Sequence, residues 1–217
     1  MQNTRKPLMD KAAAAVTRRR HLLGGMAALA CAGWRPAYAA GAATASRDTS
    51  AANVLAACQR LGKALSAAPQ PEAGLQALDQ ALASTVGHKL FTVLVLNWEK
   101  KENQRYYSNQ PGAYPTGGSK PIVEKGWFYE NVIVAGRPQI QRDAGDIIQA
   151  FPDHALIRSL GCESAINYPL RFGGRTIGSL NLLHEARWYS EADEPALQLL
   201  AALALPLVME IVRQQVR

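Results

Sequence analysis

Two asparagines lie almost symmetrically about the dipeptide Gly173-Gly174, and their amide groups are the first candidates for ligand chemistry. Side chains alternate between the two faces of a strand, so Asn167 shares a face with Ala165 and Pro169, and Asn181 shares a face with Ser179. A turn at the glycines would make the asparagines cross-strand neighbours. Each amide can donate and accept hydrogen bonds, so the pair, with Ser179 beside it, can hold a polar ligand. Alternatively, the two bond to each other or to nearby backbone inside the sheet, or a register shift of one residue turns one of them to the other face.

Aromatic side chains with polar tips form a second group of candidates. The proline- and glycine-rich loop SNQPGAYPTGGSKP (108–121) contains Tyr114 and Lys120, and it is preceded by Tyr106 and Tyr107 and followed by Trp127 and Tyr129. We interpret this loop as a lid and the aromatic residues as a wall of a ligand pocket, because such residues line many binding sites. The alternative is that they only cover the sheet.

Metal and thiol chemistry have little support in the sequence. His88, His154 and His184 are isolated, with no pair at i, i+4 and no cysteine at metal spacing, so we expect no metal site. Cys162 follows Leu160-Gly161 at a helix end, where no helix N-terminus lowers the pKa of a thiol. Cys58 and Cys162 are either one disulfide or, as we favour, two buried thiols, and we expect no enzyme activity.

The spacing of hydrophobic residues predicts the helices and strands that position these candidate residues. Apolar residues at helical intervals predict two amphipathic helices at the start and a long one from Ser190, and a β-branched, aromatic run predicts a strand buried on both faces. The predicted elements are helices over 51–67, 71–86, 122–135, 143–151, 153–160 and from 190 onward, and strands over 88–98, 104–108, 138–141, 164–170 and 176–184.

The run GCESAINYPLRFGGRTIGSLNLLH (161–184), with GWFYENVIVAGRPQIQRD upstream and Tyr189-Ser190-Glu191-Ala192-Asp193 downstream, resembles a GAF domain over about residues 72–213. The resemblance implies an α+β fold with a central antiparallel β-sheet, terminal helices on one face and a small-molecule pocket on the other. It leaves the ligand and any cofactor unknown, since GAF domains bind many different molecules and fold does not dictate function.

The residues before the predicted domain resemble an export signal. TRRRHLLGGMAALACAGWRPAYAA (17–40) places arginines before a short apolar run and ends in Ala-Tyr-Ala, which predicts a cleavable signal over residues 1–39. The arginines before Leu22 resemble a twin-arginine signal, with an ordinary Sec signal as the alternative. We expect a periplasmic or otherwise exported protein; the alternative through Ala28-Leu29-Ala30-Cys31 is a lipid anchor on Cys31.

Removal of the signal changes the charge balance of the chain. Residues 1–39 hold 7 of the 24 Lys and Arg and 1 of the 17 Asp and Glu, which leaves 17 basic and 16 acidic residues in the mature chain. The basic character therefore belongs to the signal, and no nucleic-acid partner is expected. A flexible linker over residues 40–50 and one GAF-like domain over 51–217 follow.

Taken together, the sequence predicts an exported, stand-alone GAF-like domain that binds an unidentified small molecule as a sensor or carrier. The apolar stripes Leu55 to Leu65 and Leu197 to Ile211 favour a homodimer. A separate signalling partner is expected for a sensor, because the chain carries no output segment. The alternatives are a thiol enzyme like the GAF-type methionine-(R)-sulfoxide reductases, whose cysteine cluster is not seen here, and a dimerising interaction module without ligand.

Overall fold

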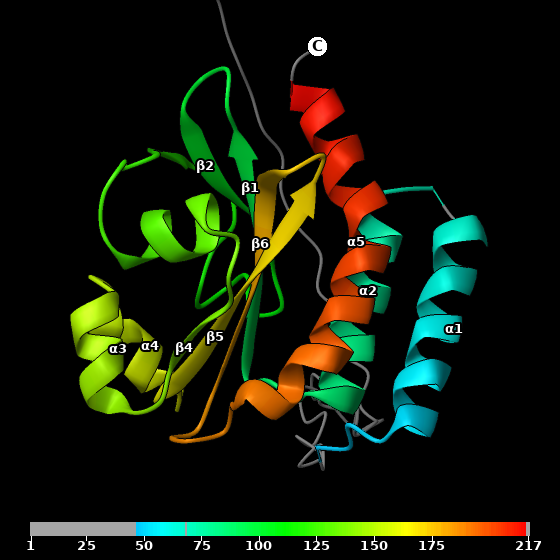
Figure 1. Ribbon diagram of the computed structural model, residues 1–217, viewed down its shortest axis with the longest axis horizontal. Coiled ribbons are helices and arrows are strands. Elements are labelled where there is room, and N and C mark those ends of the chain that lie inside the picture. The colour runs from blue at the N-terminus through cyan, green and yellow to red at the C-terminus, as the bar shows by residue number, and fades with distance from the viewer. Residues whose placement is uncertain (1–46, 68, 216–217) are drawn as a thin grey trace, which may run out of the picture. The chain divides into compact units, whose positions relative to one another are not determined.

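The computed structural model describes residues 47–67 and 69–215 and places a six-stranded antiparallel sheet between two layers of helices (Figure 1). The strand order is β3-β2-β1-β6-β5-β4. This is the α+β architecture that the sequence predicts. The strands are β1 (Leu90–Asn97), β2 (Glu102–Ser108), β3 (Ser119–Pro121), β4 (Gln139–Gln141), β5 (Ser164–Phe172) and β6 (Arg175–His184).

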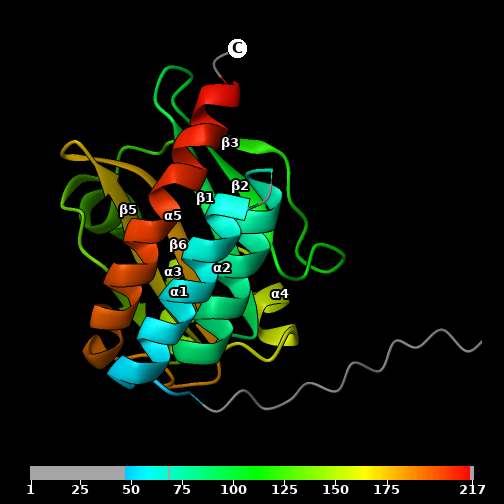
Figure 2. The same ribbon diagram turned by 90° about the vertical axis from the view of Figure 1, so that its right-hand side faces the viewer.

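Three long helices lie on one side of the sheet (Figure 2). They are α1 (Ala51–Ala67), α2 (Glu72–Thr85) and α5 (Glu194–Gln215). Helix α5 packs on the strands, and α1 packs on α2 and α5 from the outer side (Figure 1). Their apolar stripes join strand residues such as Phe91 and Leu182 in the main hydrophobic cluster, where Leu61, Leu78 and Leu200 are fully buried. Burial of these large aliphatic side chains is the main source of stability for this layer.

Helix α5 begins after a 3₁₀ turn, η2 (Glu191–Asp193), whose start is fixed by a capping box between Ser190 and Asp193. Together with that turn, Glu191–Gln214 is long and apolar enough to cross a membrane by length and composition alone. Leu197, Leu207 and Ile211 are nevertheless buried against the sheet, as in the core helix of a globular domain.

Shorter elements cover the other face. They are η1 (Phe128–Val134), a π-helix, and the helices α3 (Ala144–Ala150) and α4 (His154–Ser159). The side chain of Asp143 caps α3 by accepting hydrogen bonds from the backbone N–H groups of Gly145 and Asp146. The sequence predicts one helix over 122–135, but Ile122 instead packs beside Leu96 and η1 begins only at Phe128.

The segment before α1 is attached to the domain. Arg47 forms an ion pair of 2.5 Å with the buried carboxylate of Asp193, and the backbone N–H of Asp48 donates to Thr85 O at 3.0 Å. Residues 47–50 thus belong to the folded domain rather than to the linker that the sequence assigns to 40–50. The signal over 1–39, Cys31 and the rest of the linker lie outside the described residues.

Candidate functional site

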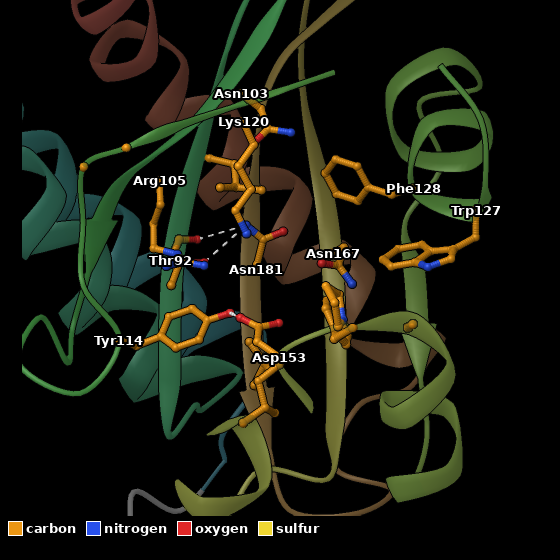
Figure 3. Close-up of a pocket in the computed structure, with 18 residues that line it drawn as sticks. Thr92, Asn103, Arg105, Tyr114, Lys120, Trp127, Phe128, Asp153, Asn167 and Asn181 are labelled. Atoms are coloured by element: carbon orange, nitrogen blue, oxygen red, sulfur yellow. Dashed lines mark hydrogen bonds between the residues drawn. The ribbon is translucent and has the colours of Figure 1, made fainter. Parts of the chain in front are cut away.

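A cavity of about 290 Å³ opens on the sheet face opposite the three long helices (Figure 3). Four central strands form its floor, the loop between β2 and β3 forms one side, and η1 with the α3–α4 connection forms the other. The lining residues on the strands are Thr92, Leu94, Asn103, Arg105, Asn167, Asn181 and Leu183, and those around them include Tyr114, Gly117, Gly118, Lys120, Trp127, Phe128, Phe151, Asp153 and Ile157.

The two predicted asparagines face each other across β5 and β6 on this floor. Asn167 pairs directly with Asn181 in the strand register, and their exposed fractions are only 2% and 6%. Asn167 Nδ2 donates to Gln141 Oε1 of β4 at 2.9 Å, and Ser179 Oγ donates to Asn181 Oδ1 at 3.0 Å. Asn181 Nδ2 makes longer contacts of 3.4 Å with Thr92.

These contacts combine the two interpretations that the sequence leaves open. The asparagines line the cavity, yet each is also held by sheet neighbours, and they do not bond to each other. No described residue donates a hydrogen bond to Asn167 Oδ1, so an acceptor remains at the cavity floor. A fixed amide with one unoccupied acceptor is suited to orienting a polar ligand.

Tyr114 ties the loop to both sides of the cavity. Its hydroxyl donates to Asp153 Oδ2 at 2.6 Å, and the guanidinium carbon of Arg105 lies 3.8 Å from its ring centroid. Arg105 Nη1 also donates to Pro115 O at 3.0 Å. Burial, and secondly the bond to Asp153, raises the pKa of Tyr114 far above its usual value, so the hydroxyl stays a donor. Residues 109–118 are therefore anchored across the cavity mouth.

The charged lining residues are two cations and one carboxylate: Arg105, Lys120 and Asp153. Asp153 is already bonded to Tyr114. Arg105 Nε is buried without a hydrogen-bond partner. In the part of the chain that the structure describes, neither cation forms an ion pair with an acidic side chain, so the cavity has a surplus of positive charge.

Aromatic rings make up the wall opposite the cations. Trp127, at the start of η1, contacts Phe128 edge-on at 5.5 Å between ring centroids and Phe151 at 5.7 Å. Edge-to-face packing of this kind holds large apolar side chains in fixed positions. Asn167 lies beside this wall in Figure 3, whereas Arg105 and Lys120 lie across the cavity from it.

Of the seven site residues predicted from the sequence, the cavity brings together Asn167, Asn181, Tyr114 and Trp127. The other three are corrections to the expected lining. Ser179 is buried next to Asn181 as its hydrogen-bond partner. Tyr129 packs with the small cluster around Leu96 and Ile133.

Tyr107 lies on the opposite face of the sheet, where its hydroxyl donates to Asp79 Oδ2 of α2 at 2.7 Å. The cause is a bulge between β1 and β2. Tyr107 pairs with Val93 but Arg105 pairs with Leu94, so Tyr106 is an extra residue that reverses the alternation. Asn103 and Arg105 face the cavity, and both tyrosines face the helices.

Sequence reasoning missed the charged lining residues Arg105 and Asp153 and the floor residues Thr92 and Asn103. The i, i+2 spacing of Asn103 and Arg105 in a polar strand is a signal that they share a face. Asp153 carries no such signal, because an aspartate directly before a helix is typical of an N-cap residue. It reaches the cavity through the packing of α4 beside the loop.

The thiols and histidines of the described residues lie outside the cavity lining. Cys58 and Cys162 are both free, and burial raises the pKa of Cys162 to about 11 and that of Cys58 above its usual value. Both therefore stay protonated, which disfavours nucleophilic attack. Across residues 47–67 and 69–215, no group of three or more His, Cys, Asp or Glu side chains could hold a metal ion.

Comparison with known proteins identifies a family model and several solved structures that are similar to this chain. A family model described as "GAF domain" matches residues 67–206. No curated protein matches the sequence. Among solved structures, the GAF domain of a phosphoenolpyruvate-protein phosphotransferase from Coxiella burnetii is similar, with a TM-score of 0.56 and 17% identity over 76% of this chain and 96% of that one.

Two further solved structures are similar at comparable levels. The free methionine-R-sulfoxide reductase of Neisseria meningitidis, in complex with its substrate, has a TM-score of 0.57 and 20% identity over 78% of this chain and 96% of its own. A phycoerythrobilin-bound GAF domain from a cyanobacterial phytochrome has a TM-score of 0.56 and 14% identity over 77% and 98%. At these identities the likeness is one of fold.

Proposed function

Because this chain belongs to the GAF domain family, we propose that it binds a small molecule outside the cytoplasm and acts as a sensor or carrier module. The family consists of small-molecule-binding sensor modules, and the similar solved structures include regulatory and photosensory domains. The ligand-binding part of the proposal is supported by the cavity, and the location is supported by the signal-like sequence over residues 17–40.

The observation that carries the proposal is the cavity above the Asn167–Asn181 pair. Its volume of about 290 Å³ is near the lower end of the range for small-molecule pockets, which runs from roughly 300 to 1,000 Å³. It combines an apolar aromatic wall with a few fixed polar groups, as ligand pockets do.

A non-enzymatic role is supported by the state of the thiols. The reductase of Neisseria meningitidis shares the fold. Cys162 is fully buried in a cluster with Leu90 and Ile157, and its pKa is raised to about 11, so it lacks the reactive thiolate that thiol-dependent reduction requires. We therefore assign no catalytic residue and no cofactor.

The test is native mass spectrometry of freshly purified protein, compared with the same sample after denaturation. We expect a mass excess in the native spectrum that disappears on denaturation, and we expect Trp127→Ala, which opens the aromatic wall, to lose it. Tyr129→Phe is the matched control, since Tyr129 lies in the same element but outside the cavity lining. An empty native protein in both forms would favour the interaction module instead.

A further inference from the structure

We propose that the cavity accepts a small organic anion with an apolar body, and that its acidic group lies between Arg105 and Lys120. This inference rests on the proposed ligand-binding function and specifies the chemical class of the ligand. It follows from the charge of the lining residues, from the position of the two cations, and from the aromatic wall that faces them.

The first argument is the uncompensated charge. Arg105 and Lys120 line the cavity with Asp153 as the only lining carboxylate, and Asp153 accepts a hydrogen bond from Tyr114. Among the ion pairs within residues 47–67 and 69–215, none includes Arg105 or Lys120. A half-buried guanidinium without a counter-ion is costly, so an anionic ligand would be stabilised here.

The second argument is the placement of the two cations on neighbouring strands. Lys120 of β3 pairs with Asn103 of β2, and Arg105 follows Asn103 by two positions on the same face. Diagonal neighbours of this kind have Cβ atoms within about 8 Å, which long side chains can span. The two positive groups therefore line the same cavity from neighbouring strands, close enough for one acidic group to contact both.

The third argument concerns the free donors of Arg105. Of its guanidinium N–H groups, one is bonded to Pro115 O while the plane stacks on the ring of Tyr114. Stacking fixes the plane of the guanidinium without using its N–H donors, of which an arginine has five. A fixed guanidinium with unused donors is suited to bind a carboxylate through two parallel hydrogen bonds.

The opposite end of the cavity defines the rest of the ligand. Trp127, Phe128 and Phe151 form an apolar wall, and Figure 3 shows Trp127 and Phe128 across the cavity from Arg105. Asn167 and Asn181 lie on the floor between the two ends and can hydrogen-bond a polar group in the middle of the molecule. The arrangement fits an aryl or alkyl acid better than a cation or a fully polar solute.

The experiment uses matched probes that differ only in charge: phenylacetate with phenylacetamide, and hexanoate with hexanamide, plus 2-phenylethylamine and acetate. Binding is measured by thermal shift and isothermal titration calorimetry. We expect both long acids to bind, their neutral amides to bind at least about tenfold more weakly because they lack the charge-assisted hydrogen bonds, and the amine and acetate to have no effect.

Variants locate the acidic group. Arg105→Gln should weaken phenylacetate binding by about tenfold or more, and Lys120→Gln by about threefold. Lys120 is exposed, and its side chain forms no ion pair with a described residue, so its variant keeps the test valid if Arg105→Gln disturbs the loop. Lys125→Gln, outside the cavity, is the matched control and should bind like the wild type.

The outcomes separate this inference from the function on which it rests. Equal binding of acid and amide, or unchanged acid binding in both Arg105→Gln and Lys120→Gln, would overturn the anion assignment and leave the cavity a binding site. Failure of all six probes would also overturn it. The mass excess in the native spectrum would then still decide the ligand-binding function independently.

Discussion

Asn167 and Gln141 form a buried pair of amides that joins the edge strand β4 to β5. Gln141 is 4% exposed, so its Oε1 loses its partner when Asn167 is shortened. We expect Asn167→Ala to lower the free energy of unfolding by about 1–3 kcal/mol, the usual cost of an unsatisfied buried polar group. Asn181→Ala should cost a similar amount, because the buried Ser179 Oγ then loses the acceptor to which it donates at 3.0 Å.

Urea denaturation of Asn167→Ala, Asn181→Ala and Gln141→Ala, and of Asn167→Ala with Gln141→Ala, measures these losses. The double variant should be less destabilised than the sum of Asn167→Ala and Gln141→Ala, since both members of the pair are then absent. Additive effects would contradict a direct bond between the two amides.

His88 is a buried imidazole on the helix side of the sheet. Its Nε2 lies 2.7 Å from Asp79 Oδ1, and its Nδ1 is buried without a partner, so a proton added there has no acceptor. Burial, together with the nearby His184, lowers the pKa of His88 to about 4. Between that value and the usual 6.5, the unfolded chain binds a proton that the folded chain does not.

Stability should therefore fall as the pH falls from 6.5 towards 4. We expect a loss of about 1–2 kcal/mol between pH 7.5 and pH 5 from this residue. Proton uptake by Asp79, whose pKa is raised by burial, opposes the loss at lower pH. Urea denaturation at both pH values should show a smaller difference for His88→Gln than for the wild type, and an unchanged one for His154→Gln. An equal difference in all three proteins would assign the pH dependence to other groups.

Among the elements, the loop over residues 109–118 depends on Tyr114 for its position. Tyr114→Phe removes the hydroxyl bonded to Asp153 but keeps the ring beneath Arg105, and Tyr114→Ala removes both. Loss of one hydrogen bond of about 1 kcal/mol should increase local opening by roughly fivefold to tenfold.

Hydrogen–deuterium exchange is the measurement. The amides of Tyr114 and Gly117, bonded to Gln110 O and Arg105 O, should exchange faster in Tyr114→Phe and faster still in Tyr114→Ala. Tyr129→Phe should leave them unchanged. Protection equal to the wild type in Tyr114→Ala would mean that the loop is held by its backbone turns alone.

The sequence predicts the pairing of some strands but not the face on which every strand residue lies. The period-two pattern on both sides of Gly173-Gly174 is enough to predict the β5–β6 pairing but not its register. A regular ladder from a turn at these glycines would pair Asn167 with Leu180, and the bulge at Ile177 shifts the partner to Asn181. Tyr107 could not be placed, because the one-residue bulge at Tyr106 leaves no mark in the composition of the strand. A single extra residue reverses every later side chain.

The charged residues of the cavity could not be predicted from the sequence for a different reason. Arg105, Tyr114 and Asp153 are far apart in the sequence and meet only because the loop crosses the sheet and α4 packs beside it. Local spacing carries information about one element at a time, whereas this contact depends on three. The sequence therefore predicts the amides on one hairpin better than the ion-binding groups that surround them.

At the scale of the whole molecule, α5 leaves an apolar stripe on its outer side. Leu199 and Met209 are 54% and 40% exposed, with Ala202 and Pro206 between them. Such a stripe is suited to pairing with a second copy about a twofold axis, and we expect a homodimer at micromolar concentration. Sedimentation velocity should give a dimer for the wild type and a monomer for Leu199→Glu with Met209→Glu.

Leu156→Glu is the control for that experiment, because Leu156 is a partly exposed leucine on α4 rather than on the stripe. It should remain dimeric. A wild-type monomer under the same conditions would contradict the assembly, and a monomer in the control would place the contact on the other side of the sheet.

We also expect the N-terminal signal to be cleaved from the exported protein. Cleavage after Ala39 leaves a short segment before Arg47, whose ion pair with Asp193 fixes the start of the folded domain. Mass spectrometry of the exported protein should find an N-terminus near Ala40, and intact Met1 or a purely cytosolic protein would contradict the signal. Replacing Arg19 and Arg20 together by Lys should stop export by the twin-arginine route, whereas continued export would assign the Sec route.

Both margins of the sheet end in strands of three residues, β3 and β4. β3 is Ser-Lys-Pro and fully exposed, so its outer margin offers a proline without an N–H group and a charged lysine. Neither feature favours the addition of a foreign strand, which is the route by which open sheets aggregate. We therefore expect a signalling partner to recognise this domain elsewhere than at the β3 edge, and concentrated protein to resist polymerisation through that edge.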